Sequence, residues 1–309
     1  MSLTGPLYER VASAPAVPAG LPLIVTLTGS TDAGSAVSRL VDHLRTEHEP
    51  EPIVDFNADV LFDYRARRPL ITFDGDRLVE YQPPRLELSL AHDTLGQPFL
   101  LLAGYEPDFA WEAFAETVVG LVEGMEVSTV TWVQAIPLPV PHTRPLGTTV
   151  SGTRPALTEA HSVWKPHTQV PATAGHLLEY RLTEAGAPVA GFVLLIPHYL
   201  AETDFPAAAI AGLDSISVAT GLLFDSDTLR EENREYLEKV DDQVSGSEEL
   251  TAMLHNLENR YDAYMAGSTQ AQPIINTADL PSADELAAEL ERFLANRPSG
   301  DDDRRPGLG

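Results

Sequence analysis

Long apolar runs alternate with amphipathic stretches over the first two thirds of the chain. Four runs are rich in valine, isoleucine and leucine and lack a clean apolar–polar alternation, which is typical of parallel strands covered on both faces. These runs span residues 21–29, 97–107, 125–139 and 188–199. Stretches with apolar residues at helical spacing follow them, at 34–46, 108–124, 174–185 and 206–224. The pattern predicts an α/β fold, a three-layer α/β/α domain with a mainly parallel sheet.

Two segments depart from this pattern. Residues 70–92 contain Asp74-Gly75, a turn signal between two short strands, so we expect a hairpin at an edge of the sheet. After about Phe224 the chain becomes rich in charge and helix formers, with apolar stripes over 228–244 and 247–266 that predict a C-terminal helical appendage.

These features predict three regions. We expect the α/β/α domain over residues 1–226, and a helical C-terminal region over 227–297 with a linker near 266–281. The Pro-, Gly- and Asp-rich end, residues 298–309, is expected to be disordered.

Composition narrows the classes of function. The 309 residues include 20 Lys and Arg against 46 Asp and Glu, a net charge of -26, so we expect neither nucleic acid nor an anionic membrane as a partner. The chain has no cysteine, which excludes disulfides, a thiolate nucleophile and cysteine metal sites. No signal-peptide pattern and no membrane-length apolar run is found, and a cytoplasmic location is expected.

The stretch "LTGSTDAGSAV", residues 27–37, is similar to a phosphate-binding loop. Gly29 and Gly34 bracket four residues, but Ser35 stands where the lysine of G-x-x-x-x-G-K-[ST] belongs, which excludes an ATP-hydrolysing loop. An anion could still bind the N–H groups at the helix start. The favoured alternative is that the Asp32 carboxylate caps those same groups, since it would also repel phosphate.

Two proline-flanked loops follow predicted strands. "PHTRP", residues 141–145, contributes His142, Thr143 and Arg144, and "PHYL", residues 197–200, contributes His198 and Tyr199. Because ligands bind beyond the carboxyl ends of parallel strands, we expect both loops to lie near the turn at Asp32 and to form the main polar cleft.

Each residue of these loops has a functional and a structural interpretation. A histidine could act as an acid or base and Arg144 as an anion clamp. Alternatively, "PHTRP" is a rigid crossover in which Arg144 pairs with one of the many acidic residues, and both interpretations stay open. For His198 alone, a hydrogen bond to a carbonyl is favoured.

Three arginines lie within four positions, at Arg65, Arg67 and Arg68. They could form an anion site, but salt bridges to a neighbouring subunit are favoured for an isolated basic cluster. The histidines show no metal-ligand spacing, and no nucleophile elbow, H-E-x-x-H motif or Rossmann fingerprint is present. We therefore expect no metal and no cofactor.

Five motifs together carry a family resemblance. "GSTDAG", "FDYRARRPLI", "LLAGYEPDFAWEAF", "PHTRP" and "IPHYL" occur in the order seen in actinobacterial members of the proteasome assembly chaperone type-2 family, over about residues 20–265. The resemblance implies an α/β/α domain similar to purine nucleoside phosphorylases, followed by a helical appendage. Eukaryotic relatives help assemble proteasome rings, whereas the resemblance implies no settled activity for the bacterial branch. No phosphorylase site aligns residue by residue.

The motifs and the family resemblance leave two hypotheses for the function. The favoured one is a non-enzymatic, assembly-chaperone-like or protein-interaction factor with an unknown protein client. The alternative is a binder or hydrolase of a nucleoside or phosphorylated ligand, so the sequence leaves open whether the chain is an enzyme. The implied fold and the arginine cluster also predict a homo-oligomer, a trimer or a multiple of it. A water-excluding cleft with converging side chains would favour the enzyme, and a self-satisfied strand edge would favour the interaction factor.

Overall fold

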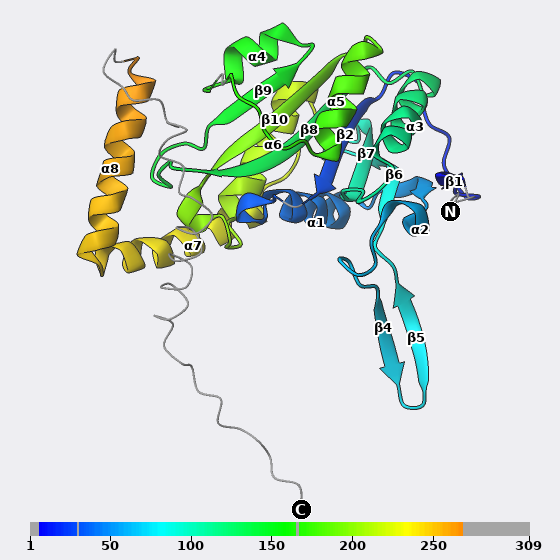
Figure 1. The fold of residues 1–309 in the computed structure, drawn as a ribbon, viewed down its shortest axis with the longest axis horizontal. Coiled ribbons are helices and arrows are strands. Elements are labelled where there is room, and N and C mark those ends of the chain that lie inside the picture. The colour runs from blue at the N-terminus through cyan, green and yellow to red at the C-terminus, as the bar shows by residue number, and fades with distance from the viewer. Residues whose placement is uncertain (1–5, 30, 165–166, 268–309) are drawn as a thin grey trace, which may run out of the picture.

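The computed structural model describes residues 6–29, 31–164 and 167–267 and is built on one large sheet (Figure 1). The sheet has eight strands in the order β1-β3-β6-β7-β2-β8-β10-β9. Their bounds are Tyr8–Arg10 for β1, Pro22–Thr28 for β2, Glu51–Phe56 for β3, Leu86–His92 for β6, Pro98–Tyr105 for β7, Thr129–Leu138 for β8, Thr148–Gly152 for β9 and Val189–Pro197 for β10. The four predicted apolar runs are β2, β7, β8 and β10, the centre of this sheet.

The sheet is parallel at its centre, as predicted, and antiparallel strands flank that centre on both sides. The four central strands run parallel, through the pairs β2–β7, β2–β8 and β8–β10. The pairs β1–β3, β3–β6, β6–β7 and β9–β10 are antiparallel. The connection from His92 to Pro98 is too short for a crossover, and it therefore forces β6 and β7 into a hairpin.

Helices cover both faces of the sheet, so the predicted three layers are confirmed (Figure 1). One core cluster joins α1 and α6 to one face, and a second joins α3 and α5 to the other. Ile24 of β2 lies in the first cluster while Leu23 and Val25 lie in the second. Both faces of this strand are therefore buried, which explains why apolar and polar residues do not alternate cleanly along it. The helices are α1 Ala36–His48, α2 Ala58–Leu61, α3 Trp111–Gly124, α4 Pro155–His161, α5 Ala174–Glu184 and α6 Pro206–Thr220, with short 3₁₀ turns η1 Ala33–Ser35 and η2 His198–Leu200.

The predicted hairpin forms, but its expected position at an edge of the sheet is wrong. β4, Leu70–Asp74, and β5, Arg77–Gln82, make a separate two-stranded ribbon that projects from the body (Figure 1). Pro83 and Pro84 follow, and because proline has no N–H to donate to a ladder, they separate β5 from β6. β6 then enters the main sheet between β3 and β7. We call residues 70–82 the arm.

The predicted C-terminal appendage is present as two helices, α7 Asp227–Ser245 and α8 Glu248–Met265. α7 places Leu229 and Val240 in the core cluster of α1 and α6, and Tyr236 Oη lies 2.6 Å from Thr203 Oγ1. The Ser247 side chain caps α8 by accepting from the Leu250 N–H. The predicted linker beyond residue 267 and the predicted tail at 298–309 lie outside the described residues. Within the described ranges, no helix is both long and apolar enough to cross a membrane.

Candidate functional site

The turn after β2 is a helix cap. Asp32 Oδ1 accepts from the Val37 N–H at 2.6 Å, and Oδ2 accepts from the N–H and the hydroxyl of Ser38 at 2.9 and 2.7 Å. Gly34 has a φ of 68°, in the left-handed region that favours glycine, and donates its N–H to the Ala201 carbonyl at 2.7 Å. The predicted cap is confirmed, and it uses the N–H groups that a phosphate would need.

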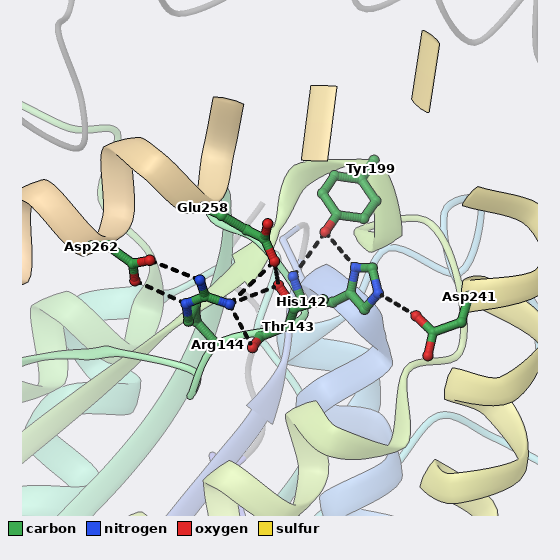
Figure 2. A network of polar contacts seen from close by, with 7 residues as sticks. All are labelled: His142, Thr143, Arg144, Tyr199, Asp241, Glu258 and Asp262. Atoms are coloured by element: carbon green, nitrogen blue, oxygen red, sulfur yellow. Dashed lines mark hydrogen bonds and ion pairs between the residues drawn. The ribbon is translucent and has the colours of Figure 1, made fainter. Parts of the chain in front are cut away.

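The two proline-flanked loops meet at the carboxyl edge of the sheet, as predicted. Because β8 and β10 are parallel neighbours, "PHTRP" and "PHYL" leave from the same edge. The His142 N–H donates to Tyr199 Oη at 2.8 Å, and His142 Nδ1 lies 2.7 Å from the same oxygen (Figure 2). His198 packs its ring edge-on against Tyr199, with centroids 5.4 Å apart. The turn at Asp32 is close by, since Asp32 forms a bridge with Ala135 of β8.

The Arg144 guanidinium is bound by carboxylates of α8 (Figure 2). Its Nε and Nη2 donate to the two carboxylate oxygens of Asp262 at 2.8 and 2.7 Å, and its Nη1 donates to Glu258 Oε1 at 3.1 Å. Thr143 Oγ1 also donates to Glu258 Oε1, at 2.6 Å. The hydrogen bonds to Asp262 raise the pKa of Arg144 above its usual value, and Arg144 in turn lowers the pKa of the Asp262 carboxyl.

His142 connects the same edge to α7. Its side chain is 2% exposed, and Nε2 lies 3.2 Å from Asp241 Oδ1 (Figure 2). All contacts are satisfied when the Tyr199 hydroxyl donates to Nδ1 and the Nε2–H donates to Asp241. Burial raises the pKa of Tyr199 to about 12, so the phenol keeps its proton at neutral pH.

Tyrosines of α8 add two further contacts to this edge. Tyr261 Oη donates to the Pro145 carbonyl at 3.0 Å, and Tyr264 Oη donates to the Val163 carbonyl at 2.8 Å. Both rings pack against a small cluster formed by Leu138, Val140 and Leu195. The loop residues predicted as a polar cleft therefore face helices of their own chain, and we call α7 and α8 together the strap.

Two further cavities lie near the carboxyl ends of the central strands, and neither is lined by residues of "PHTRP" or "PHYL". One of about 20 Å³, room for a single water, lies beside the buried Glu106, which accepts the Ala174 N–H at 2.6 Å. The second is an open groove of about 490 Å³ at the base of the arm, the arm-root groove. Its walls include Val41, Asp42, Arg45, Pro83, Pro84 and Tyr105.

The arginine cluster does not converge on one site. Arg67 Nη1 pairs with Asp108, and its guanidinium lies over the Tyr105 ring, 5.5 Å from the centroid. Arg65 and Arg68 are exposed, and neither forms an ion pair within the part of the chain that the structure describes. Two of the three cations are therefore available to another molecule.

Sequence reasoning missed the strap residues that complete the network. Asp241, Glu258 and Asp262 are three of 46 acidic residues, and their type alone does not distinguish them. The one available signal is spacing, since Glu258 and Asp262 are four apart in a predicted helix and so share a face. That signal does not identify Arg144 as their partner.

The PAC2 family model matches residues 26–244. A solved structure from Corynebacterium glutamicum, of unknown function, is 32% identical with a TM-score of 0.80 and covers 85% of this chain and 99% of its own. A Mycobacterium tuberculosis protein of unknown function is 37% identical with a TM-score of 0.77, and the match covers 84% of this chain and 90% of that protein. A proteasome-assembly chaperone homologue from M. tuberculosis shares the fold at 22% identity with a TM-score of 0.69, and the match covers 76% of this chain and 100% of that protein. No curated protein matches the sequence.

Proposed function

Because the chain belongs to the PAC2 family, which its motifs predicted, we propose that it is a non-enzymatic, assembly-chaperone-like protein-interaction factor. One observation carries this proposal. His142 and Arg144, the residues that would serve as acid or base and as anion clamp, are bonded to Asp241, Glu258 and Asp262 of the strap. The edge where an enzyme of this topology would bind its ligand is thus occupied by the chain's own helices.

The relatives favour a protein as the partner. The M. tuberculosis relative is described as a proteasome-assembly chaperone homologue, and a Pyrococcus furiosus relative with the same fold as an archaeal proteasome activator. Unassembled proteasome subunits are therefore the client class to test first. The absence of cysteine fits a reducing cytoplasm, where such a client would be made.

We also propose that the protein acts as a homo-oligomer, a trimer or a multiple of it. The nucleoside-phosphorylase-like fold that the family resemblance implies is one reason, and the exposed Arg65 and Arg68 are the other. Light scattering at micromolar concentration tests this directly, and a monomeric mass would overturn it.

The function is tested by mixing the full chain with purified, unassembled proteasome α-subunits and following complexes by size exclusion with light scattering. A stoichiometric complex with free subunits that does not form with assembled rings supports the chaperone-like function. In parallel, calorimetry with inorganic phosphate and with a purine nucleoside tests the small-molecule alternative. Ligand binding that is lost in Arg144→Ala while the fold stays intact, together with no subunit binding, would replace the proposal by the alternative.

A further inference from the structure

The buried residue Glu106 has one carboxylate oxygen that receives no hydrogen bond. Glu106 directly follows β7 and is 7% exposed, and its Oε1 accepts the Ala174 N–H at the start of α5 at 2.6 Å. In the described part of the chain, no donor reaches Oε2 and no basic side chain pairs with Glu106. Because a buried carboxylate is costly without a partner, this oxygen needs a donor or a cation.

A second polar group without a partner lies on the same face of the sheet. Leu102 of β7 and Trp132 of β8 both pack in the core cluster of α3 and α5. Since side chains alternate along a strand, Gln134, two positions after Trp132, and Glu106, four after Leu102, face the same side. The Gln134 amide forms no hydrogen bond within the described ranges, and its buried Oε1 is unpaired. A half-turn about its last bond presents either its oxygen or its NH₂ to a neighbour.

Both groups line the cavity of about 20 Å³, which holds a single water-sized particle. Gly29 of the turn after β2 makes the arrangement possible, because a Cβ at this position would overlap Glu106 Oε2. The cavity also lies where the chain changes sides of the sheet. The helix after β2, α1, covers one face, and the helix after β7, α3, covers the other. Ligands of parallel sheets bind in the crevice at such a point.

The charge of the site matches a monovalent cation. Glu106 is the one acidic side chain of the described residues that line the cavity, and no group of three or more His, Asp or Glu side chains suited to a metal ion occurs in the described residues. The positive end of the α5 dipole offsets part of the Glu106 charge through Oε1 and leaves Oε2 without compensation. The net charge of -26 also concentrates cations around the molecule.

We propose that this cavity binds a monovalent cation of the size of a water molecule, ammonium or potassium, between Glu106 and Gln134. Ammonium donates N–H groups to Glu106 Oε2 and to the amide oxygen of Gln134, and potassium is coordinated by the same two oxygens. The bound ion links the ends of β7 and β8 across β2, beside the first turn of α5. Sodium is smaller than the cavity and choline is far larger, so neither replaces it.

Thermal unfolding of the full chain in different chloride salts tests the inference. Ammonium, potassium, sodium and choline are compared at one ionic strength, so that general screening is constant. Ammonium or potassium should raise the midpoint by about 2–4 °C over choline, and the rise should saturate with concentration, because a ligand that binds only the folded state stabilises it. Sodium should have a smaller effect. The comparison of ammonium with potassium shows which of the two ions the cavity prefers.

Three variants place the ion. Glu106→Gln keeps an acceptor for the Ala174 N–H and removes the charge, and its NH₂ group supplies a donor in place of the ion, so the response to the cation should disappear. Gly29→Ala should also abolish the response, because its Cβ displaces Oε2. Glu123→Gln is the matched control, since it removes the same charge from an exposed position on α3 and should keep the full response.

Nuclear magnetic resonance with isotope-labelled ammonium chloride detects the ion in the unmodified chain and does not depend on how any variant folds. A bound ammonium ion is shielded from water, so its protons should give a signal separate from that of free ammonium. Potassium should displace this signal, and choline should not.

Equal midpoints in all four salts, without a separate ammonium signal, would overturn the inference, and the cavity then holds only water. A sodium response equal to that of ammonium and potassium also overturns it, because it reflects the general ion atmosphere. A response that survives in Glu106→Gln or Gly29→Ala places the ion elsewhere. Loss of the response in both variants, a full response in Glu123→Gln and a displaceable ammonium signal together support the site.

Discussion

Replacing Tyr199 with phenylalanine tests whether the predicted site residues hold the strap or serve a ligand. The substitution keeps the ring and removes one hydroxyl oxygen, which lies 2.8 Å from the His142 backbone nitrogen and 2.7 Å from its Nδ1. The His142 side chain is 2% exposed, so water does not readily replace the lost oxygen. The variant therefore leaves two buried polar atoms without their partner.

The magnitude follows from these two atoms. Each buried polar atom that loses its hydrogen-bond partner costs about 1–3 kcal/mol, so Tyr199→Phe should lower the free energy of unfolding by about 2–6 kcal/mol. Packing contributes little, because the phenylalanine ring fills the same volume. The substitution weakens the contact between "PHTRP" and "PHYL", and because it loosens His142 it also weakens the contact of His142 with Asp241 of α7.

Urea unfolding, followed by circular dichroism and by tryptophan fluorescence, measures this cost, and coincident transitions confirm two-state behaviour. Tyr180→Phe is the control, because Tyr180 is 58% exposed and the change should stay within about 0.5 kcal/mol. A Tyr199→Phe variant as stable as the control would refute the structural interpretation of this edge. Unchanged stability combined with lost metabolite binding would instead favour a ligand site.

Further outcomes are expected elsewhere in the chain. Asp32→Ala should cost about 1–2 kcal/mol in urea unfolding, and Asp32→Asn less, because the amide keeps one acceptor for the cap of α1; equal stability of Asp32→Ala and the unmodified chain would contradict the cap. Arg144→Ala should speed hydrogen exchange in α8 while exchange in β8 stays slow, and faster exchange throughout would argue against a local contact. Arg144 lowers the pKa of Asp262, so the ion pair between them stabilises the fold fully above the unfolded pKa of 3.8 and is lost as pH falls through the lower folded pKa. Hydrogen exchange in α8 should therefore rise below about pH 4. Burial lowers the pKa of both His48 and His176, so the stability that depends on their neutral rings is complete above the unfolded pKa of 6.5 and is lost on acidification. The free energy of unfolding should therefore fall from about pH 7 to about pH 5. Replacing both histidines with glutamine should flatten this slope.

Much of the fold was predictable because burial on both faces leaves a clear pattern. A strand such as β2 contributes Leu23 and Val25 to one core cluster and Ile24 to the other, so consecutive positions are apolar and the strand is recognisable alone. β1 and β9 were not predicted, because they are short and contain few apolar residues. Their pairing partners, β3 and β10, are set by the surrounding sheet rather than by a local pattern.

The arm shows the same limit. The Asp74-Gly75 turn signal was sufficient to predict two paired strands. Whether they joined the main sheet depended on Pro83 and Pro84 and on what lay beside them, which a hairpin pattern does not encode. The bulge at Glu80, which places four apolar side chains on one face, became visible only through the pairing register.

At the candidate site, the sequence by itself determined which loops meet. Parallel strands end at one edge, so "PHTRP" and "PHYL" had to lie together once β8 and β10 were neighbours. The sequence also favoured Asp32 as the cap of the helix that follows its turn. What those loops contact was decided only by the tertiary structure. Asp241 lies 99 residues from His142, and Asp262 lies 118 residues from Arg144. Ion pairing is non-local and any of 46 carboxylates has the required charge, so the path of α7 and α8 across the sheet edge selected the partners.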